Sequence, residues 1–265
     1  MPLTVRQGPG PGRSSSARSG RHRSWRVAGL GALALSMAAG AVAAGPGAAG
    51  ANVTKRVRDA DVRLASKALL TTSAFPGLGW TESDTKVSSG SWPTGAAGAT
   101  FAGCVGVPQS LLEVDPPEAQ SAVYQNSFSG VSVDEEVQVF ATAQAAAADI
   151  GVSANPRTPG CEHQLLTSSY GASFTEGLAQ AVGSGSAVGT VTVTALPKPA
   201  DGQEAAAYEI TVPVIDGTKQ VTFHIDNVSI GRGRLEAGLS LLSAGTFPAK
   251  LAAHLEAVAA AKLRT

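Results

Sequence analysis

AAAYEITVPVIDGTKQVTFHIDNVSIGRGRLEAGLSLL, residues 205–242, is the stretch that decides the fold of this chain. Apolar and polar side chains alternate in three segments of this stretch and in one segment just before it, as they do in strands with one buried face. The four segments are 190–196, 205–214, 220–230 and 234–242. Asp216-Gly217 and the glycines of GRG (231–233) lie between the last three segments, and such residues form tight turns. The C-terminal half is therefore predicted to be an antiparallel meander.

Outward from this meander, other patterns predict further strands and helices. The expected elements are a helix at 59–70, strands at 121–129 and 133–141, a helix at 142–150 and a closing helix at 248–263. Residues 81–100 are rich in Ser, Gly and Thr and are predicted to be a loop. Strands interrupted by helices indicate the α+β class, with helices packed on one face of an antiparallel β-sheet.

The N-terminus has the three parts of a secretory signal. Residues 1–26 are rich in arginine and contain no acid, 27–44 are apolar, and the run ends in small residues around Ala43. We interpret 1–44 as a signal segment, 45–56 as a flexible lead and 57–265 as one α+β extracytoplasmic domain. The alternative is that the apolar run stays uncleaved as a membrane anchor. Either outcome predicts a secreted or cell-surface protein.

The charge distribution argues against one class of partner. Six of the 20 basic residues lie in the first 50 positions, which leaves 14 basic and 20 acidic residues in the rest of the chain. A domain with this acidic excess and no basic stripe is a poor candidate for nucleic-acid binding. We therefore expect no nucleic-acid partner.

Cys104 and Cys161 are the chain's two cysteines, and both lie within the exported part. An oxidising compartment favours a disulfide between them, which we predict to join two loops. The alternative is a reactive thiol, which needs a depressed pKa and a neighbouring base.

We assign no catalytic residue, metal site or cofactor from the sequence. His224 and Asp226 share a face of a predicted strand, but two ligands are too few for a typical metal site. The carboxylates of 134–136 are interpreted as a solvated charged face. The segments GVSAN (151–155) and GASFT (171–175) lack the second glycine of a nucleophile elbow.

Several segments resemble the PknH-like extracellular sensor domain family of actinobacteria. They are, together with Cys104 and Cys161, LASKALL (64–70), FPGLGW (75–80), SAVYQNSFS (121–129), VDEEVQVFATAQAAAADI (133–150) and VSIGRGRLEAGLSLL (228–242). The resemblance implies an α+β fold with a cleft and a ligand-sensing or ligand-binding role. The chain departs from the family in lacking a kinase domain and in having one cysteine pair where the family often has two.

The resulting hypothesis is a free-standing, non-catalytic domain that binds a small molecule, a lipid or an envelope component. Membrane contact is expected only through an uncleaved signal segment. Two alternatives remain open: a secreted envelope hydrolase, which would show converging titratable residues in a cleft, and a protein–protein interaction module, which would expose a large apolar patch.

Overall fold

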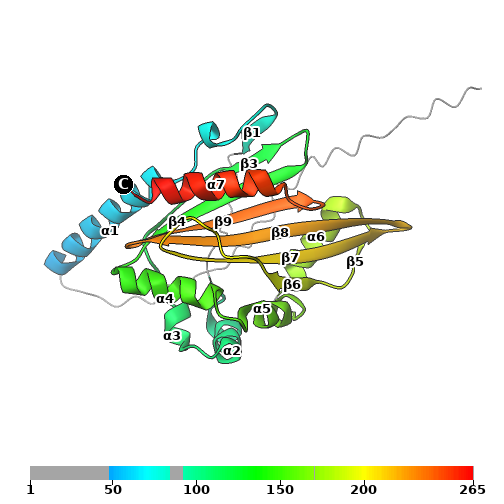
Figure 1. Ribbon diagram of the computed structural model, residues 1–265. Helices are drawn as coiled ribbons and strands as arrows, with labels where there is room; N and C mark the ends of the chain where they lie inside the picture. Colours follow the sequence, from blue (N-terminus) through cyan, green and yellow to red (C-terminus); the bar gives the residue numbers. More distant parts are fainter. Residues whose placement is uncertain (1–47, 84–91, 170, 265) are drawn as a thin grey trace, which may run out of the picture.

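The computed structural model describes residues 48–83, 92–169 and 171–264, and these residues build one large antiparallel sheet with helices (Figure 1). The sheet has the strand order β1-β3-β4-β9-β8-β7-β5, with β2 paired to β4 and β6 paired to β7. The signal segment 1–44 lies outside the described residues.

The centre of the sheet is the predicted meander. It consists of β7 (Glu204–Asp216), β8 (Lys219–Arg232) and β9 (Leu235–Ala244), each antiparallel to the next. Gly217 and Gly233 turn the chain with φ of 60° and 59°, a conformation that glycine adopts at little cost. β5 (Ala187–Val188) and β6 (Thr192–Ala195) both pair with β7 at the edge of the sheet.

The N-terminal strands extend the sheet on the other side of β9. β4 (Val131–Val139) pairs with β9 over eight residue pairs, from Ser132↔Leu242 to Val139↔Leu235. The shorter strands on this side are β1 (Trp80–Ser83), β2 (Glu118–Gln120) and β3 (Val123–Asn126). Each of them is antiparallel to its neighbour.

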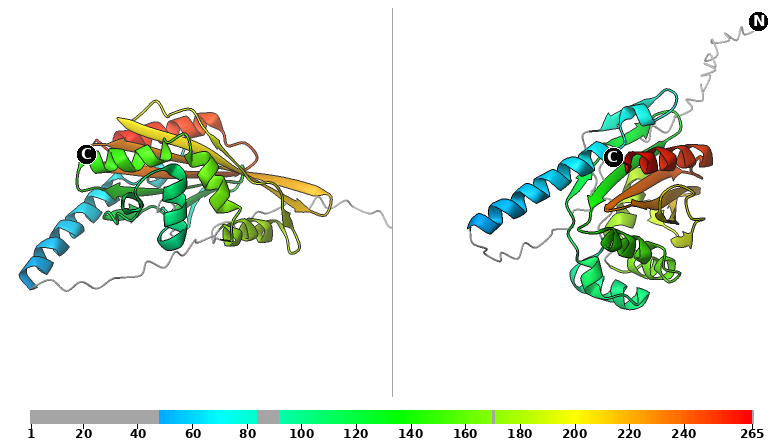
Figure 2. Two further views of the ribbon diagram at one scale, coloured as in Figure 1. Left: turned by 90° about the horizontal axis from the view of Figure 1, so that it is seen from below. Right: turned by 60° about the vertical axis from the view of Figure 1, so that its left-hand side comes forward.

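One face of the sheet is covered by α1 (Ala48–Ala68) and α7 (Ala249–Lys262). The odd-numbered residues of β9 from Leu235 to Leu241 face these helices and form a core with Ala65, Ala68 and Leu255. Lys262 Nζ donates a hydrogen bond to the carbonyl of Leu69 at 2.6 Å and so ties the end of α7 to the end of α1. Figure 2 shows the other end of α1 extending away from the sheet.

The opposite face is covered by α4 (Ala143–Ser153) and α6 (Ala172–Val182). Leu178 of α6 packs in a second core with Val212 and Phe223, whose side chains point away from α7 because residues alternate along each strand. Ile150 of α4 lies directly over Gly231. A third cluster joins α2 (Gly95–Val105), α3 (Gln109–Leu112) and α5 (Thr158–Leu166) beside α4.

The α+β class, the antiparallel sheet and the disulfide are confirmed, with helices on both faces rather than on one. Two further expectations are corrected. Residues 48–56, expected to be flexible, form the first turns of α1, and α2 begins within the predicted loop 81–100. Segment 55–58 (KRVR) contains good helix formers, and the small residues of α2 allow close packing.

No helix in the described part of the chain has both the length and the apolarity needed to cross a bilayer.

Candidate functional site

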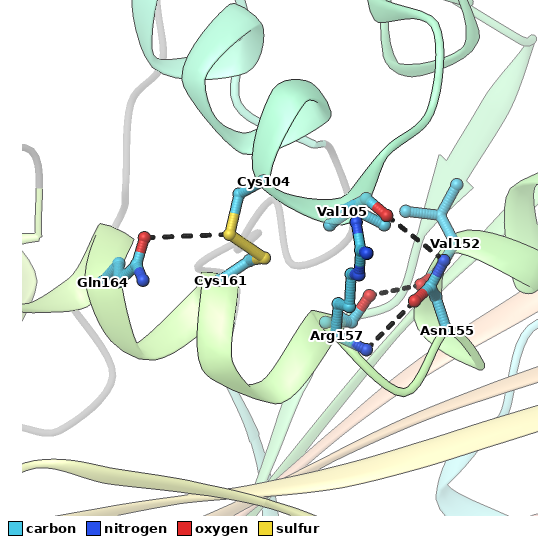
Figure 3. Close-up of a disulfide and its surroundings, with 8 residues drawn as sticks. Cys104, Val105, Val152, Asn155, Arg157, Cys161 and Gln164 are labelled. Carbon is cyan, nitrogen blue, oxygen red and sulfur yellow. Dashed lines mark hydrogen bonds between the residues drawn. A yellow bond between two sulfur atoms is a disulfide. The ribbon is translucent and has the colours of Figure 1, made fainter.

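The predicted disulfide is present but joins two helices instead of two loops (Figure 3). Cys104 lies on α2 and Cys161 on α5, with a Cα–Cα distance of 5.8 Å. Asn155, which precedes α5, also contacts α2, because its Nδ2 donates a hydrogen bond to the carbonyl of Val105 at 3.4 Å. Cys161 is 4% exposed within the third core cluster. This burial, together with the bond itself, makes the pair a structural element.

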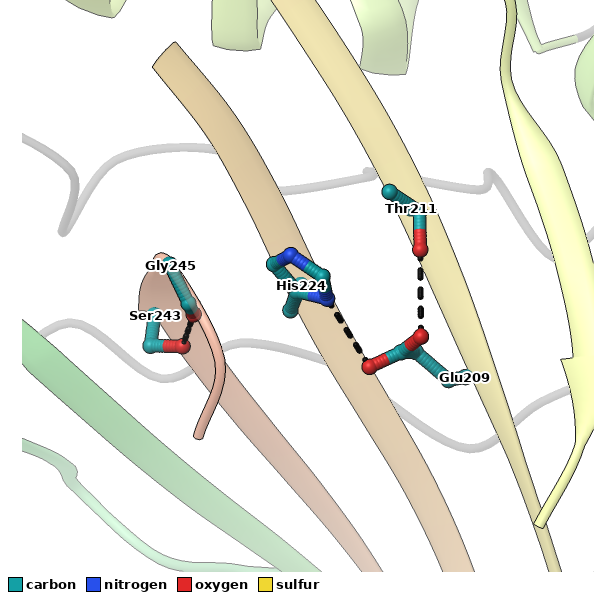
Figure 4. Close-up of polar contacts among 5 residues, drawn as sticks. All are labelled: Glu209, Thr211, His224, Ser243 and Gly245. Atoms are coloured by element: carbon teal, nitrogen blue, oxygen red, sulfur yellow. Dashed lines mark hydrogen bonds and ion pairs between the residues drawn. The ribbon is translucent and has the colours of Figure 1, made fainter. Parts of the chain in front are cut away.

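His224 and Asp226 share one face of β8, as the strand pattern predicts, and a third group joins them from β7 (Figure 4). Glu209 Oε2 lies 2.9 Å from His224 Nδ1, and Glu209 Oε1 accepts a hydrogen bond from Thr211 at 3.1 Å. Burial, followed by the charge of Glu209, raises the pKa of Asp226 to about 6, and His224 lowers it in part. The sequence showed His224 and Asp226, but only the register of β7 against β8 brings Glu209 to them.

An imidazole oriented by a carboxylate is half of a hydrolytic site, but a nucleophile must lie on its other side. Ser243 of β9 is the direct cross-strand neighbour of His224. Its hydroxyl, however, donates to the carbonyl of Gly245 (Figure 4). Among the described residues there is also no group of three or more His, Cys, Asp or Glu side chains that could hold a metal ion.

The carboxylates of 134–136 do not form a solvated face, so that interpretation is wrong. Glu135 and Glu136 are each 1% exposed, on opposite faces of β4. Helices cover both faces of the sheet, and therefore both sets of alternating side chains are buried. Gln138 Nε2 donates to Glu136 Oε1 at 2.5 Å, and the backbone N–H of Leu70 donates to Glu135 Oε2.

A pair of buried acids lies between β9 and α4. Asp149 accepts a hydrogen bond from Trp92 Nε1 at 3.1 Å and shares a second hydrogen bond with Glu236. Two carboxyl groups can be joined this way only if a proton lies between them. Burial first, and then the charge of Asp149, raise the pKa of Glu236 well above its usual range, while burial raises that of Asp149 to about 6.

The segments tested as nucleophile elbows are parts of helices. Ser153 is the last residue of α4, and 171–175 begins at the N-cap of α6. Neither follows a strand, so neither has the strand–turn–helix geometry that exposes a nucleophile.

A concave site that the sequence did not reveal lies between α1, α7 and the β8–β9 turn. It is a pocket of about 410 Å³, open to solvent, and we call it the arginine pocket. Its apolar wall consists of one leucine from each of three elements or their ends, Leu64, Leu235 and Leu263. Its polar wall consists of Arg232, Arg234 and Arg264, with Gly233 in the turn.

The β8–β9 hairpin fixes the position of two of these arginines. Arg232 pairs with Leu235 across a two-residue turn, and Gly233 takes the positive φ at its first position, as in a type II′ turn. Arg234 is tied down by its Nε, which donates to the carbonyl of Phe140 at 2.6 Å, and by Nη2, which lies 3.1 Å from Asp61 Oδ2. The GRGR run was recognised as a turn, but nothing in its pattern shows that α1 and α7 meet there.

No protein-family model and no curated protein matches the chain. Among solved structures, the fold has a weak similarity to the crystal structure of the extracellular domain of PknH from Mycobacterium tuberculosis. The TM-score is 0.43 at 10% sequence identity, and the match covers 76% of this chain and 95% of that chain.

Proposed function

We propose that this chain is an extracytoplasmic domain that binds a ligand, a small molecule, lipid or envelope component, without transforming it chemically. The observation that carries the proposal is the arginine pocket. Its volume of about 410 Å³ falls in the range of small-molecule sites, and it combines an apolar wall with a few positioned polar groups, as such sites usually do.

The extracytoplasmic location is supported by two independent features. The disulfide between Cys104 and Cys161 is typical of proteins that fold outside the reducing cytoplasm. Segment 1–44 has the pattern of an export signal, which would be removed or kept as a membrane anchor. A binding role rather than a hydrolytic one is supported by Ser243, whose hydroxyl proton is donated to the carbonyl of Gly245 and not to His224.

Mass spectrometry of the exported protein tests this proposal. The full chain is produced in an exporting bacterial host, and its mass is measured under native and under denaturing conditions. We expect extra native mass that disappears on denaturation, and a denatured mass that lacks the signal segment and two hydrogens.

A pair of leucine variants ties the extra mass to the pocket. Leu64→Glu places a charge in the apolar wall and should remove the ligand, whereas Leu78→Glu changes a leucine that is 84% exposed outside the pocket and should keep it. An apo mass for the wild-type protein, or equal ligand loss in both variants, would contradict the proposal.

A further inference from the structure

Arg232 is the least satisfied polar group of the arginine pocket. Its Nε is fully shielded from solvent, yet it has no hydrogen-bond partner among the described residues. A buried donor without an acceptor costs free energy, and the cost is larger for a charged group than for a neutral one. The side chain cannot easily leave, because the residue is held in β8 by its pairing with Leu235.

The charges of the pocket are not balanced by its own walls. Arg234 is offset by Asp61, with an Nη2–Oδ2 distance of 3.1 Å. Arg232 and Arg264 are in no ion pair within the described part of the chain, and the residues lining the pocket include no acid. Two guanidinium groups, one at the end of β8 and one two residues beyond α7, therefore line one concavity without a counter-charge from the described residues.

Guanidinium groups select particular anions. Their planar fork of N–H donors matches the oxygens of a carboxylate or a phosphate, which it can bind through two parallel hydrogen bonds. An anion in this pocket would supply the counter-charge that Arg232 and Arg264 lack. Leu235 and Leu263 are only 5% and 3% exposed, whereas Leu64 is partly exposed. Leu64 therefore offers a surface for hydrocarbon, and an anion that carries an apolar chain would use both walls of the pocket.

We propose, building on the binding function above, that the ligand is an anionic amphiphile whose carboxylate or phosphate head binds Arg232 and Arg264 while its apolar chain contacts the apolar wall at Leu64. Arg234 acts as a positioning residue, because its bonds to Phe140 and Asp61 hold the turn that presents Arg232.

Calorimetric titration of the full exported chain tests this inference with four probes: decyl phosphate, decanoate, decyl maltoside and inorganic phosphate, each below its micelle-forming concentration. The two anionic decyl probes should bind about tenfold or more tightly than the neutral one, because charge-assisted hydrogen bonds form only with them. Inorganic phosphate should bind more weakly than decyl phosphate by about tenfold or more, since it lacks the apolar chain.

Arginine variants locate the binding. Arg232→Gln should lower the affinity for decyl phosphate by about tenfold or more and leave the affinity for decyl maltoside unchanged. Arg58→Gln is the matched control, because Arg58 lies on the surface of α1, pairs with Asp115 and does not line the pocket. Arg232→Lys should retain part of the affinity for decyl phosphate, because lysine keeps the positive charge. It should lose more of the affinity for decanoate, because a carboxylate depends on the two parallel N–H donors of the guanidinium group.

The outcomes separate this inference from the broader binding function. If the neutral and anionic decyl probes bind with equal affinity, and Arg232→Gln does not change it, the inference of an anionic head is overturned, although the pocket still binds a ligand. Equal affinity for inorganic and decyl phosphate would overturn the apolar chain. If no probe binds and the native mass carries no ligand, the binding function itself falls. Should Arg232→Gln not fold, Arg264→Gln on the exposed side of the pocket gives the same test.

Discussion

The backbone N–H of Leu70 donates a hydrogen bond to Oε2 of Glu135, a carboxyl group that is 1% exposed beneath the end of α1. The carbonyl of Leu70 in turn accepts a hydrogen bond from the Tyr124 hydroxyl at 3.2 Å. Leu70 lies two residues beyond the end of α1, and both of its polar backbone groups are thus bound to side chains of the sheet, which satisfies the chain in the core just after the helix. The cost is a buried acid, whose second oxygen, Oε1, has no hydrogen-bond partner among the residues that the structure describes.

This acid makes stability depend on pH. Burial raises the pKa of Glu135 to about 8, although the Leu70 N–H and Lys262 lower it in part. Between about pH 4.5 and pH 8 the folded state holds a proton that the unfolded state has lost, so the free energy of unfolding falls as pH rises. Glu135→Gln, which mimics the protonated acid, should flatten this decline. Melting temperatures at pH 5 and pH 8 measure it, with the exposed Glu176→Gln as control. An unchanged slope in Glu135→Gln would disprove the assignment.

Two tryptophans differ in the charge of their hydrogen-bond acceptor. Trp92 Nε1 donates to Asp149 at 3.1 Å, whereas Trp80 Nε1 donates to the backbone carbonyl of Pro76 at 3.0 Å. At pH 8 the loss of the bond should cost about 1.5–3 kcal/mol in Trp92→Phe and about 0.5–1.5 kcal/mol in Trp80→Phe. At pH 5 this difference should shrink, because the pKa of Asp149 is about 6 and its carboxyl group is then protonated.

Urea unfolding followed by circular dichroism measures both tryptophan variants without relying on the fluorescence that they alter. A difference that is the same at pH 5 and pH 8 would argue against a charged acceptor for Trp92.

Gly98 and Gly103 lie in the same helix, α2, but have opposite surroundings. A Cβ at Gly98 would lie 2.2 Å from the carbonyl oxygen of Pro93, a backbone atom that cannot swing aside, whereas a Cβ at Gly103 meets nothing within 4 Å. Gly98→Ala should therefore destabilise the fold by about 1–3 kcal/mol. Gly103→Ala should stabilise it by about 0.5–1 kcal/mol, because alanine favours a helix. Thermal unfolding of the two variants in parallel decides the matter, and equal shifts would count against this packing of α2.

The disulfide should contribute a large part of the stability. Cys104 and Cys161 are 57 residues apart. Cross-linking a loop of that length lowers the entropy of the unfolded chain and so raises the free energy of unfolding by about 4 kcal/mol in the chain-entropy model. The double variant Cys104→Ser/Cys161→Ser should lose an amount of this order in urea unfolding. Reduction of the wild-type protein should reproduce the loss and leave the variant unaffected; a variant as stable as the oxidised protein would refute the structural role.

Sequence reasoning succeeded where periodicity is strong and failed where burial decides. The alternation along 205–242 predicted β7, β8 and β9, because a sheet with packed faces requires a period of two. Helices α2, α5 and α6 were missed. Each contains glycine, and α5 also has proline in its first turn, so local propensity disfavours them. They form because Phe101, Cys161 and Leu178 are buried in the tertiary structure.

The sequence by itself determined the antiparallel meander, the pairing of Cys104 with Cys161 and the shared face of His224 and Asp226, because each follows from local spacing or from there being a single possible partner. Only the tertiary structure decided that Glu135 and Glu136 are buried, since that depends on helices covering both faces of the sheet. It also decided the arginine pocket, which brings Leu64, Arg232 and Arg264 together from three distant parts of the chain. Contacts across such separations leave no periodic trace in a sequence, because they are set by how completed elements pack.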